Sequence, residues 1–141
     1  MTTFSQLIYV SDLVDKNESE LARILESAVR HNGENSITGM LLYSDGNFLQ
    51  VLEGTHDSVH ETYERICRDP RHANIMVLTE VEVPERQFAE WSMGYRHLGA
   101  DDVAKFPKYA PFFRLGFNAS RLNARPGVAL EMLELFSKGM T

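Results

Sequence analysis

The segment from Ser36 to Gly54 constrains the fold more than any other part of this 141-residue chain. Two apolar runs flank Asp45-Gly46, a dipeptide that predicts a tight β-hairpin because both turn residues tolerate positive φ. In the second strand, Gln50 lies among large apolar residues in the run Phe48-Leu49-Gln50-Val51-Leu52. A buried amide without partners costs roughly 1–3 kcal/mol. Either another polar side chain or a bound molecule must therefore satisfy Gln50.

Apolar periodicity predicts a strand and a helix ahead of the hairpin. Residues from about 4 to 11 alternate between two faces, as expected for a strand. Asn17 and Glu20 have the spacing of a capping box that opens a helix, and this helix is expected to end near residues 32–33. Its apolar stripe recurs at helical spacing and consists of Leu21, Ile24, Leu25 and Ala28.

A second helix and two further strands are predicted after the hairpin. Thr55 can cap the helix, and Asp69-Pro70 is expected to end it. Residues 74–83 and 91–98 are predicted as the fourth and fifth strands. The order βαββαββ indicates an α+β, ferredoxin-like fold, in which both helices cover one face of an antiparallel-rich sheet.

The other face of this sheet also needs cover. Leu49 and Val51 point away from the two helices and are apolar, so the sheet is expected to be buried on both sides. Residues 101–106 are predicted as a short helix and residues 128–136 as a longer one, with a loop between them. These C-terminal helices are expected to cap the second face.

Length and composition indicate a single globular unit, which we divide into a domain over residues 1–98 and a helical cap over residues 99–141. The net charge of −6 argues against nucleic acid as a partner. No apolar segment has the length needed to cross a bilayer, and the N-terminus lacks the features of a signal peptide. A lone cysteine, Cys67, fits a reducing, cytoplasmic location.

Tyr9 and Gln50 are the strongest candidate pair for a functional site. Tyr9 shares a strand face with Leu7, and Gln50 shares one with Phe48. Strands one and three are central neighbours in the predicted topology, so the phenol and the amide can meet beneath the helices. The alternative, which composition alone favours, is a core tyrosine hydrogen-bonded to a structural glutamine.

Polar residues also gather at the ends of both predicted helices. Asn32, beside His31, is either an ordinary helix cap or a ligand contact. The end of the second helix either holds an anionic or carbonyl-rich ligand or is a solvated helix terminus. Its polar residues are Arg65, Asp69, Arg71 and His72.

Metal and enzyme motifs give weaker signals. His56 and His60 have the spacing of a metal-binding pair, but no third ligand follows at a defining spacing. We therefore interpret both as surface residues and predict no metal. The sequence contains no nucleophile elbow, phosphate loop or dinucleotide fingerprint, and Cys67 has no paired His–Asn signature. The sequence therefore offers no convincing enzyme site.

Together these residues resemble the BLUF family of flavin-dependent blue-light sensors. The matching motifs follow one another in unbroken order over about residues 4–98, and the later residues are similar to those of short members that end in two helices. The motifs are Leu7-Ile-Tyr9-Val-Ser11, Asn32 ahead of Ile37-Thr-Gly39, Phe48-Leu-Gln50-Val-Leu-Glu-Gly54, Tyr63-Glu-Arg65-Ile66, Asp69-Pro-Arg-His72 and Arg86-Gln-Phe88-Ala-Glu-Trp91-Ser-Met93.

The resemblance implies a flavin ring between the two helices, with FAD as the cofactor and FMN or riboflavin as alternatives. Asn32 and Arg71 would contact the carbonyl groups of the ring. Gln50 would bridge Tyr9 to flavin N5 and the C4 carbonyl. The remaining implied contacts are apolar walls and residues along the ring edge or the phosphate tail: Ile24, Phe48 and Ile66, and His31, Arg65, Asp69 and His72.

The resemblance further implies a photochemical mechanism rather than an enzymatic one. Light would drive an electron and a proton from Tyr9 to the flavin through Gln50, which would rotate or tautomerise. Trp91 and Met93, in the fifth strand, would carry the change outward to a separate signalling protein. Homo-oligomers are also implied, while composition predicts no nucleic-acid or membrane partner. A flavin-dependent oxidoreductase and a flavin-free ferredoxin-like interaction module are the alternatives.

Overall fold

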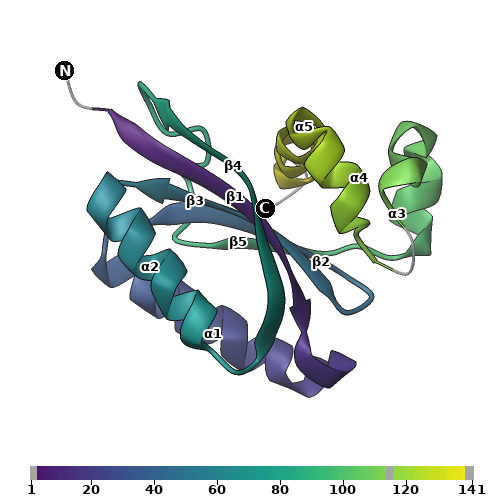
Figure 1. Cartoon of the computed structure of the whole chain (residues 1–141), viewed down its shortest axis with the longest axis horizontal. Helices are drawn as coiled ribbons and strands as arrows, with labels where there is room; N and C mark the ends of the chain where they lie inside the picture. Colours follow the sequence, from purple (N-terminus) through teal and green to yellow (C-terminus); the bar gives the residue numbers. More distant parts are fainter. Residues whose placement is uncertain (1–2, 114–115, 139–141) are drawn as a thin grey trace.

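The computed structural model describes residues 3–113 and 116–138 and has helices on both faces of one sheet (Figure 1). The strands are β1 (Phe4–Leu13), β2 (Thr38–Ser44), β3 (Asn47–Gly54), β4 (His72–Val83) and β5 (Gly94–His97). The helices are α1 (Leu21–Glu34), α2 (His56–Arg68), α3 (Ala100–Lys105), α4 (Ala119–Ala124) and α5 (Pro126–Ser137). Short 3₁₀ turns cover Val14–Lys16, Glu18–Glu20 and Pro107–Phe112.

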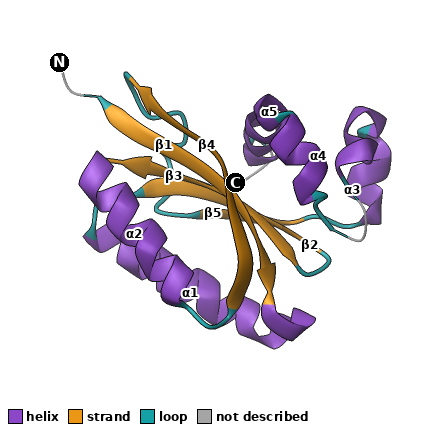
Figure 2. Cartoon of the chain, in the orientation of Figure 1, coloured by secondary structure: helices purple, strands orange, loops and turns teal. Residues whose placement is uncertain are grey.

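The five strands form a mixed sheet in the order β4-β1-β3-β2-β5, in which β5 is parallel to β2 and the other pairs are antiparallel. α1 and α2 lie on one face, and α3, α4 and α5 lie on the other (Figure 2). The predicted α+β, ferredoxin-like architecture is therefore confirmed. The two layers of helices give each face of the sheet its own hydrophobic core.

The predicted hairpin forms around Asp45 and Gly46. Their φ values are 41° and 89°, the positive values that a tight two-residue turn requires. β2 and β3 pair antiparallel on either side of this turn, and β1 pairs with the other edge of β3. The turn therefore sets the register of β2 against β3.

The start of α1 differs from the prediction. Asn17 lies between two 3₁₀ turns, and α1 begins at Leu21 without a side-chain cap, so the predicted capping box is wrong. Asp15 and Lys16 both have positive φ, which bends the chain before it can enter the helix at Asn17. The predicted cap of α2 is confirmed, since Thr55 Oγ1 accepts a hydrogen bond from the backbone N–H of Ser58 at 3.2 Å.

The segment before β5 also differs from the prediction. β5 begins at Gly94, so Trp91 and Met93 precede the strand rather than belonging to it. The backbone N–H groups of Gln87 and Phe88 bond to the fully buried carboxylate of Glu53 instead of to a neighbouring strand. This carboxylate anchors the backbone several residues ahead of β5.

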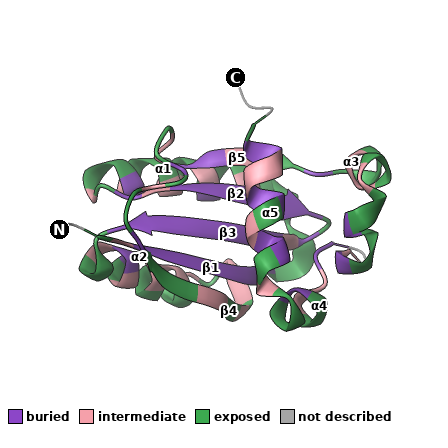
Figure 3. Cartoon of the chain, turned by 90° about the horizontal axis from the view of Figure 1, so that it is seen from above, coloured by how far each residue is buried: buried purple, intermediate pink, exposed green. Residues whose placement is uncertain are grey.

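The second face is covered as predicted, mainly by α5 (Figure 3). Leu49 and Val51 are fully buried and share one hydrophobic cluster with apolar residues of this helix. The interior residues of α5 in that cluster are Val128, Ala129, Met132, Leu133 and Phe136. The sequence pattern did not predict α4, which lies inside the segment predicted as a loop. Asn118 caps this helix, because its side-chain oxygen accepts a hydrogen bond from the backbone N–H of Arg121.

Candidate functional site

Tyr9 and Gln50 are direct cross-strand partners on β1 and β3. The Tyr9 side chain is fully buried and the Gln50 side chain is 4% exposed. The Tyr9 phenol donates a hydrogen bond to Gln50 Oε1, and Gln50 Nε2 donates to the thioether of Met93, with 3.3 Å between nitrogen and sulfur. Sulfur is a weak acceptor, so the amide N–H groups are only partly satisfied within the chain.

Burial fixes the protonation state of this phenol. Desolvation, followed by the nearby Cys67 and Tyr63, raises the pKa of Tyr9 far above its ordinary value. Tyr9 therefore remains a neutral hydrogen-bond donor at neutral pH. A neutral phenol in contact with an amide is suited to giving up an electron and a proton together, because loss of the electron makes the phenol a strong acid.

A cavity of about 260 Å³ opens between α1 and α2, with Gln50 in its wall. It is slightly smaller than typical small-molecule sites, which measure roughly 300–1,000 Å³. Its wall contains the sequence-predicted contacts other than Tyr9 and Phe48, together with residues that were not predicted. The lining residues are Ile24, Ser27, Ala28, His31, Asn32, Leu41, Gln50, Thr62, Arg65, Ile66, Arg68, Asp69, Arg71 and His72.

Two predicted contacts lie behind this wall. Tyr9 is separated from the cavity by Gln50, as its role as a donor to the amide requires. Phe48 was expected to form an apolar wall, but it is fully buried and packs against the ring of His72, with 4.9 Å between ring centroids. His72 covers the Phe48 ring and lines the cavity in its place.

Polar bonds join the two helices on either side of the cavity. His31 Nε2 lies 3.2 Å from Thr62 Oγ1, and Arg65 donates to Ser27 Oγ at 3.3 Å. Desolvation, followed by the Arg65 charge, lowers the pKa of His31, which favours its neutral form. Thr62 and Ser27 had no motif of their own, but their positions on the inner faces of predicted helices indicate that they can line the space between them.

A charged pair lies at one end of the cavity. Arg71 donates to both carboxylate oxygens of Asp69, with 2.7 Å between Nη2 and Oδ2. Burial alone would raise the pKa of Asp69, but the bonds from Arg71 outweigh it and the pKa is lowered. Desolvation lowers the pKa of His72, whose Nδ1 lies 3.1 Å from Ser11 Oγ. The site therefore holds a fixed guanidinium beside a neutral imidazole.

Asn32 lies inside α1, which continues to Glu34. It is therefore not the helix cap, and the cap position falls on Asn35. The Asn32 side chain is 2% exposed, lines the cavity, and donates from Nδ2 to the carbonyl oxygen of Ser92 at 2.9 Å. This bond ties the end of α1 to the segment that carries Trp91 and Met93.

That segment places Met93 against Gln50 and leaves Trp91 half-buried. The Trp91 ring lies over Gly94, where an added Cβ would come within 3.3 Å of it. The sequence could not distinguish between these two residues as the neighbour of Gln50, because both side chains are large and two positions apart.

The matches to known proteins agree with this geometry. The sequence model of the family described as "BLUF: Sensors of blue-light using FAD" matches residues 4–94, which is more than half of the chain. This chain belongs to the BLUF family. The resemblance inferred from the motifs is thereby confirmed, and BLUF sensors are defined by their use of FAD. The flavin cofactor that the motifs imply is therefore FAD.

Several BLUF proteins are similar to this chain. Photoactivated adenylate cyclase subunit beta of Euglena gracilis is 37% identical over 94 residues, which cover 65% of this chain and 11% of that protein. The blue light- and temperature-regulated antirepressor BluF of Escherichia coli (strain K12) is 35% identical over 118 residues, which cover 79% and 29%. The chain thus spans less than a third of either relative.

The solved structure of the BlsA photo-activated state has a TM-score of 0.75 to this BLUF chain and is 32% identical to it. The alignment covers 93% of this chain and 94% of that one, so it extends through most of the C-terminal helices. A BLUF domain is itself a sensor, although some relatives, such as the cyclase subunit, are named for an enzyme activity. No helix in the described ranges is long and apolar enough to cross a membrane.

The donors of this cavity fit the flavin of a BLUF protein. An isoalloxazine ring presents carbonyl oxygens and a ring nitrogen that accept hydrogen bonds along one edge. The cavity wall supplies amide donors from Gln50 and Asn32 and a guanidinium from Arg71. The Gln50 amide donates to the Met93 sulfur, which is a weak acceptor, so this amide can still donate to a stronger acceptor.

We expect the substitution Asn32→Ala to weaken FAD binding by about 1–2 kcal/mol, the size of one or two hydrogen bonds. Titration of the apoprotein, followed by flavin fluorescence, measures the loss. Asn35→Ala is the matched control, because Asn35 caps α1 but does not line the cavity. Equal losses in both variants would contradict a direct contact and would assign the effect to the helix end.

Proposed function

We propose that this chain is a blue-light receptor in which Tyr9 and Gln50 carry out the primary photochemistry. The buried hydrogen bond from the Tyr9 phenol to Gln50 Oε1, at the wall of the cavity between α1 and α2, is the observation that supports it. Asn32, Gln50 and Arg71 would hold the polar edge of FAD, while Ile24 and Ile66 would pack against it.

The chemistry follows from the protonation states of these residues. Bound FAD supplies absorption of blue light and a strongly oxidising excited state. With excited FAD supplying the electron acceptor, Tyr9 would release an electron together with its phenolic proton, and Gln50 Oε1, to which the phenol is already hydrogen-bonded, would accept the proton. When the proton and electron return, Gln50 is left rotated or tautomerised. Its Nε2 no longer donates to Met93 Sδ, and this changes the packing of the segment before β5.

We propose a sensor without enzyme activity of its own. The cavity wall already includes Gln50 and the polar groups that a flavin edge would use, so one ligand accounts for them. A flavin-dependent oxidoreductase would need a second molecule to reach the flavin, and steady-state oxidation of a reduced nicotinamide would support that alternative. Colourless purified protein that takes up no FAD would support a flavin-free interaction module.

The proposed output is contact with a separate protein in the cytoplasm, made by a homo-oligomer of this chain. Relatives are named as an antirepressor and as cyclase subunits, so BLUF domains are used with different effectors. The single cysteine, which is exposed, fits a reducing compartment. The negative net charge favours a protein over a nucleic acid as the partner.

The absorption spectrum tests this function. Purified protein should be yellow, and blue light should shift its flavin bands reversibly to the red. Gln50→Leu should still bind FAD but lose this shift, because leucine cannot accept the Tyr9 proton or donate to the flavin. A light-minus-dark spectrum of Gln50→Leu that matches the wild type would remove Gln50 from the mechanism.

A further inference from the structure

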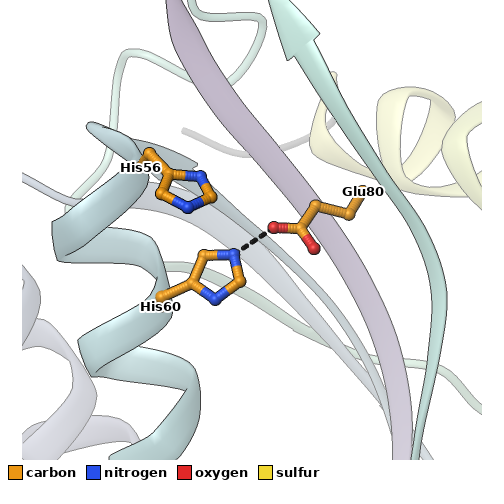
Figure 4. A group of neighbouring side chains, drawn as sticks. All are labelled: His56, His60 and Glu80. Atoms are coloured by element: carbon orange, nitrogen blue, oxygen red, sulfur yellow. Dashed lines mark hydrogen bonds and ion pairs between the residues drawn. The ribbon is translucent and has the colours of Figure 1, made fainter.

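A second cluster of chemically active side chains lies outside the flavin cavity, where α2 meets β4 (Figure 4). His56 and His60 come from the first turns of α2, and Glu80 comes from β4. One nitrogen or oxygen atom of each residue lies within 4.8 Å of those of the other two. In the described ranges 3–113 and 116–138, this is the one group of three such residues close enough to share an ion.

We propose that His56, His60 and Glu80 form a binding site for a divalent transition-metal ion of the Zn²⁺ class. Two histidines four residues apart on one helix face, completed by a carboxylate from another element, are a recurrent zinc ligand set. Mixed imidazole and carboxylate ligands favour Zn²⁺ and its neighbours over Mg²⁺ and Ca²⁺, which prefer oxygen alone.

The hydrogen bonds around the cluster leave suitable atoms for the ion. Ser5 Oγ lies 3.4 Å from His56 Nδ1, which leaves Nε2 of His56 as the ligand nitrogen. His60 Nε2 already faces Glu80 Oε2, with which it is hydrogen-bonded. A metal ion would replace the proton shared by this pair, and a hydroxyl partner on the far nitrogen orients a metal-bound imidazole.

The required movements are small. Tetrahedral ligands at about 2.0–2.1 Å from zinc lie about 3.3 Å from one another. The three side chains are already within 4.8 Å and lie at the surface, so rotations of their outer bonds are sufficient. The backbone beneath them is held by the Thr55 cap of α2 and by pairing of β4 with β1.

Charge at this surface also favours a cation. Glu82 lines the same shallow groove as the three ligands and adds a further carboxylate to this surface. The His60–Glu80 pair alone contributes little to stability, because its side chains are 40% and 35% exposed. A bound ion would cross-link α2, which carries Thr62, Arg65 and Ile66 of the flavin cavity, to the edge strand β4.

Calorimetric titration of the flavin-loaded protein with ZnCl₂ in chelator-free buffer tests the site. We expect one ion per chain with a dissociation constant of about 10 µM or tighter, reversed by EDTA. Glu80→Gln and His60→Gln should each weaken binding at least tenfold. Zinc should also raise the midpoint of thermal unfolding in the wild type and not in these variants, because an ion stabilises only the state that binds it.

Two control variants separate this site from other surface ligands. Asp57→Asn changes a carboxylate on the same helix turn but not the cluster, so zinc affinity should be retained. Cys67→Ser removes the exposed thiol and should also retain it. A wild-type dissociation constant weaker than about 1 mM, or zinc binding that survives Glu80→Gln and is lost in Cys67→Ser, would overturn the proposal. Normal photochemistry is expected in the Glu80→Gln, His60→Gln and Asp57→Asn variants and does not depend on zinc.

Discussion

Tyr9→Phe is expected to bind FAD and to give no red-shifted photoproduct under blue light. The substitution keeps the ring, which is fully buried, but removes the only group that donates to Gln50 Oε1 among the described residues. The proposed electron and proton donor is lost with the hydroxyl. The buried amide oxygen also loses its partner, which should lower the free energy of unfolding by roughly 1–3 kcal/mol.

Tyr63→Phe is the matched control for this experiment. The Tyr63 ring packs edge-on against Tyr9, with 5.8 Å between centroids, but it makes no hydrogen bond to Gln50. Burial, followed by a bond with Cys67, raises the pKa of Tyr63 to about 12, so it too is a neutral phenol at pH 7. Tyr63→Phe should retain the red shift. A normal photoproduct in Tyr9→Phe, or loss of the photoproduct only in Tyr63→Phe, would show that Tyr9 is not the donor.

The central part of this site could be predicted because local chemistry determines it. Asp45-Gly46 fixes the hairpin turn, and the alternation of β1 and β3 determines which faces Tyr9 and Gln50 share. Topology then makes the two strands neighbours. The pairing of the phenol with the amide follows from turn chemistry, periodicity and strand order, and none of these requires knowledge of side-chain packing.

Other features depend on contacts between residues far apart in the sequence. The segment ahead of β5 is anchored by bonds from the backbone N–H groups of residues 87–88 to the buried Glu53 carboxylate, which no local sequence pattern indicates. Whether Met93 or Trp91 faces Gln50 depends on the same segment. Glu80 reaches His60 only because β4 runs beside α2, so sequence spacing around the histidines could not reveal it. Local sequence patterns carry little information about such contacts between segments that are far apart in the chain.

The structure also provides a continuous route from the flavin cavity to the C-terminal cap. Gln50 bonds to Met93, and the chain enters β5 at the next residue. Within β5, the Arg96 guanidinium lies over the Phe136 ring of α5, 5.0 Å from its centroid. We propose that a change in the Gln50 bond moves Met93, shifts β5 and alters the packing of α5.

Removal of the residues after Gly99 is expected to have a large effect on assembly. Without α5, apolar residues on the second sheet face lose their cover, including Ile8, Val10, Leu49 and Val51. Each such side chain is worth about 1.5–3 kcal/mol when buried, so the truncated protein should aggregate or change its oligomeric state. Size-exclusion chromatography measures this, with a chain ending after Lys138 as the control that keeps α5 intact.

The same cap should report illumination in the intact protein. Hydrogen exchange compared in the dark and under blue light should change around the flavin cavity, in β5 and in α5, because Met93 and Arg96 link the three. Any truncated protein that remains folded should keep most of its photochemistry, since Tyr9, Gln50 and the cavity residues all precede Gly99. Exchange that changes around the cavity but in neither β5 nor α5 would exclude this output route, and it would leave the roles of Tyr9 and Gln50 intact.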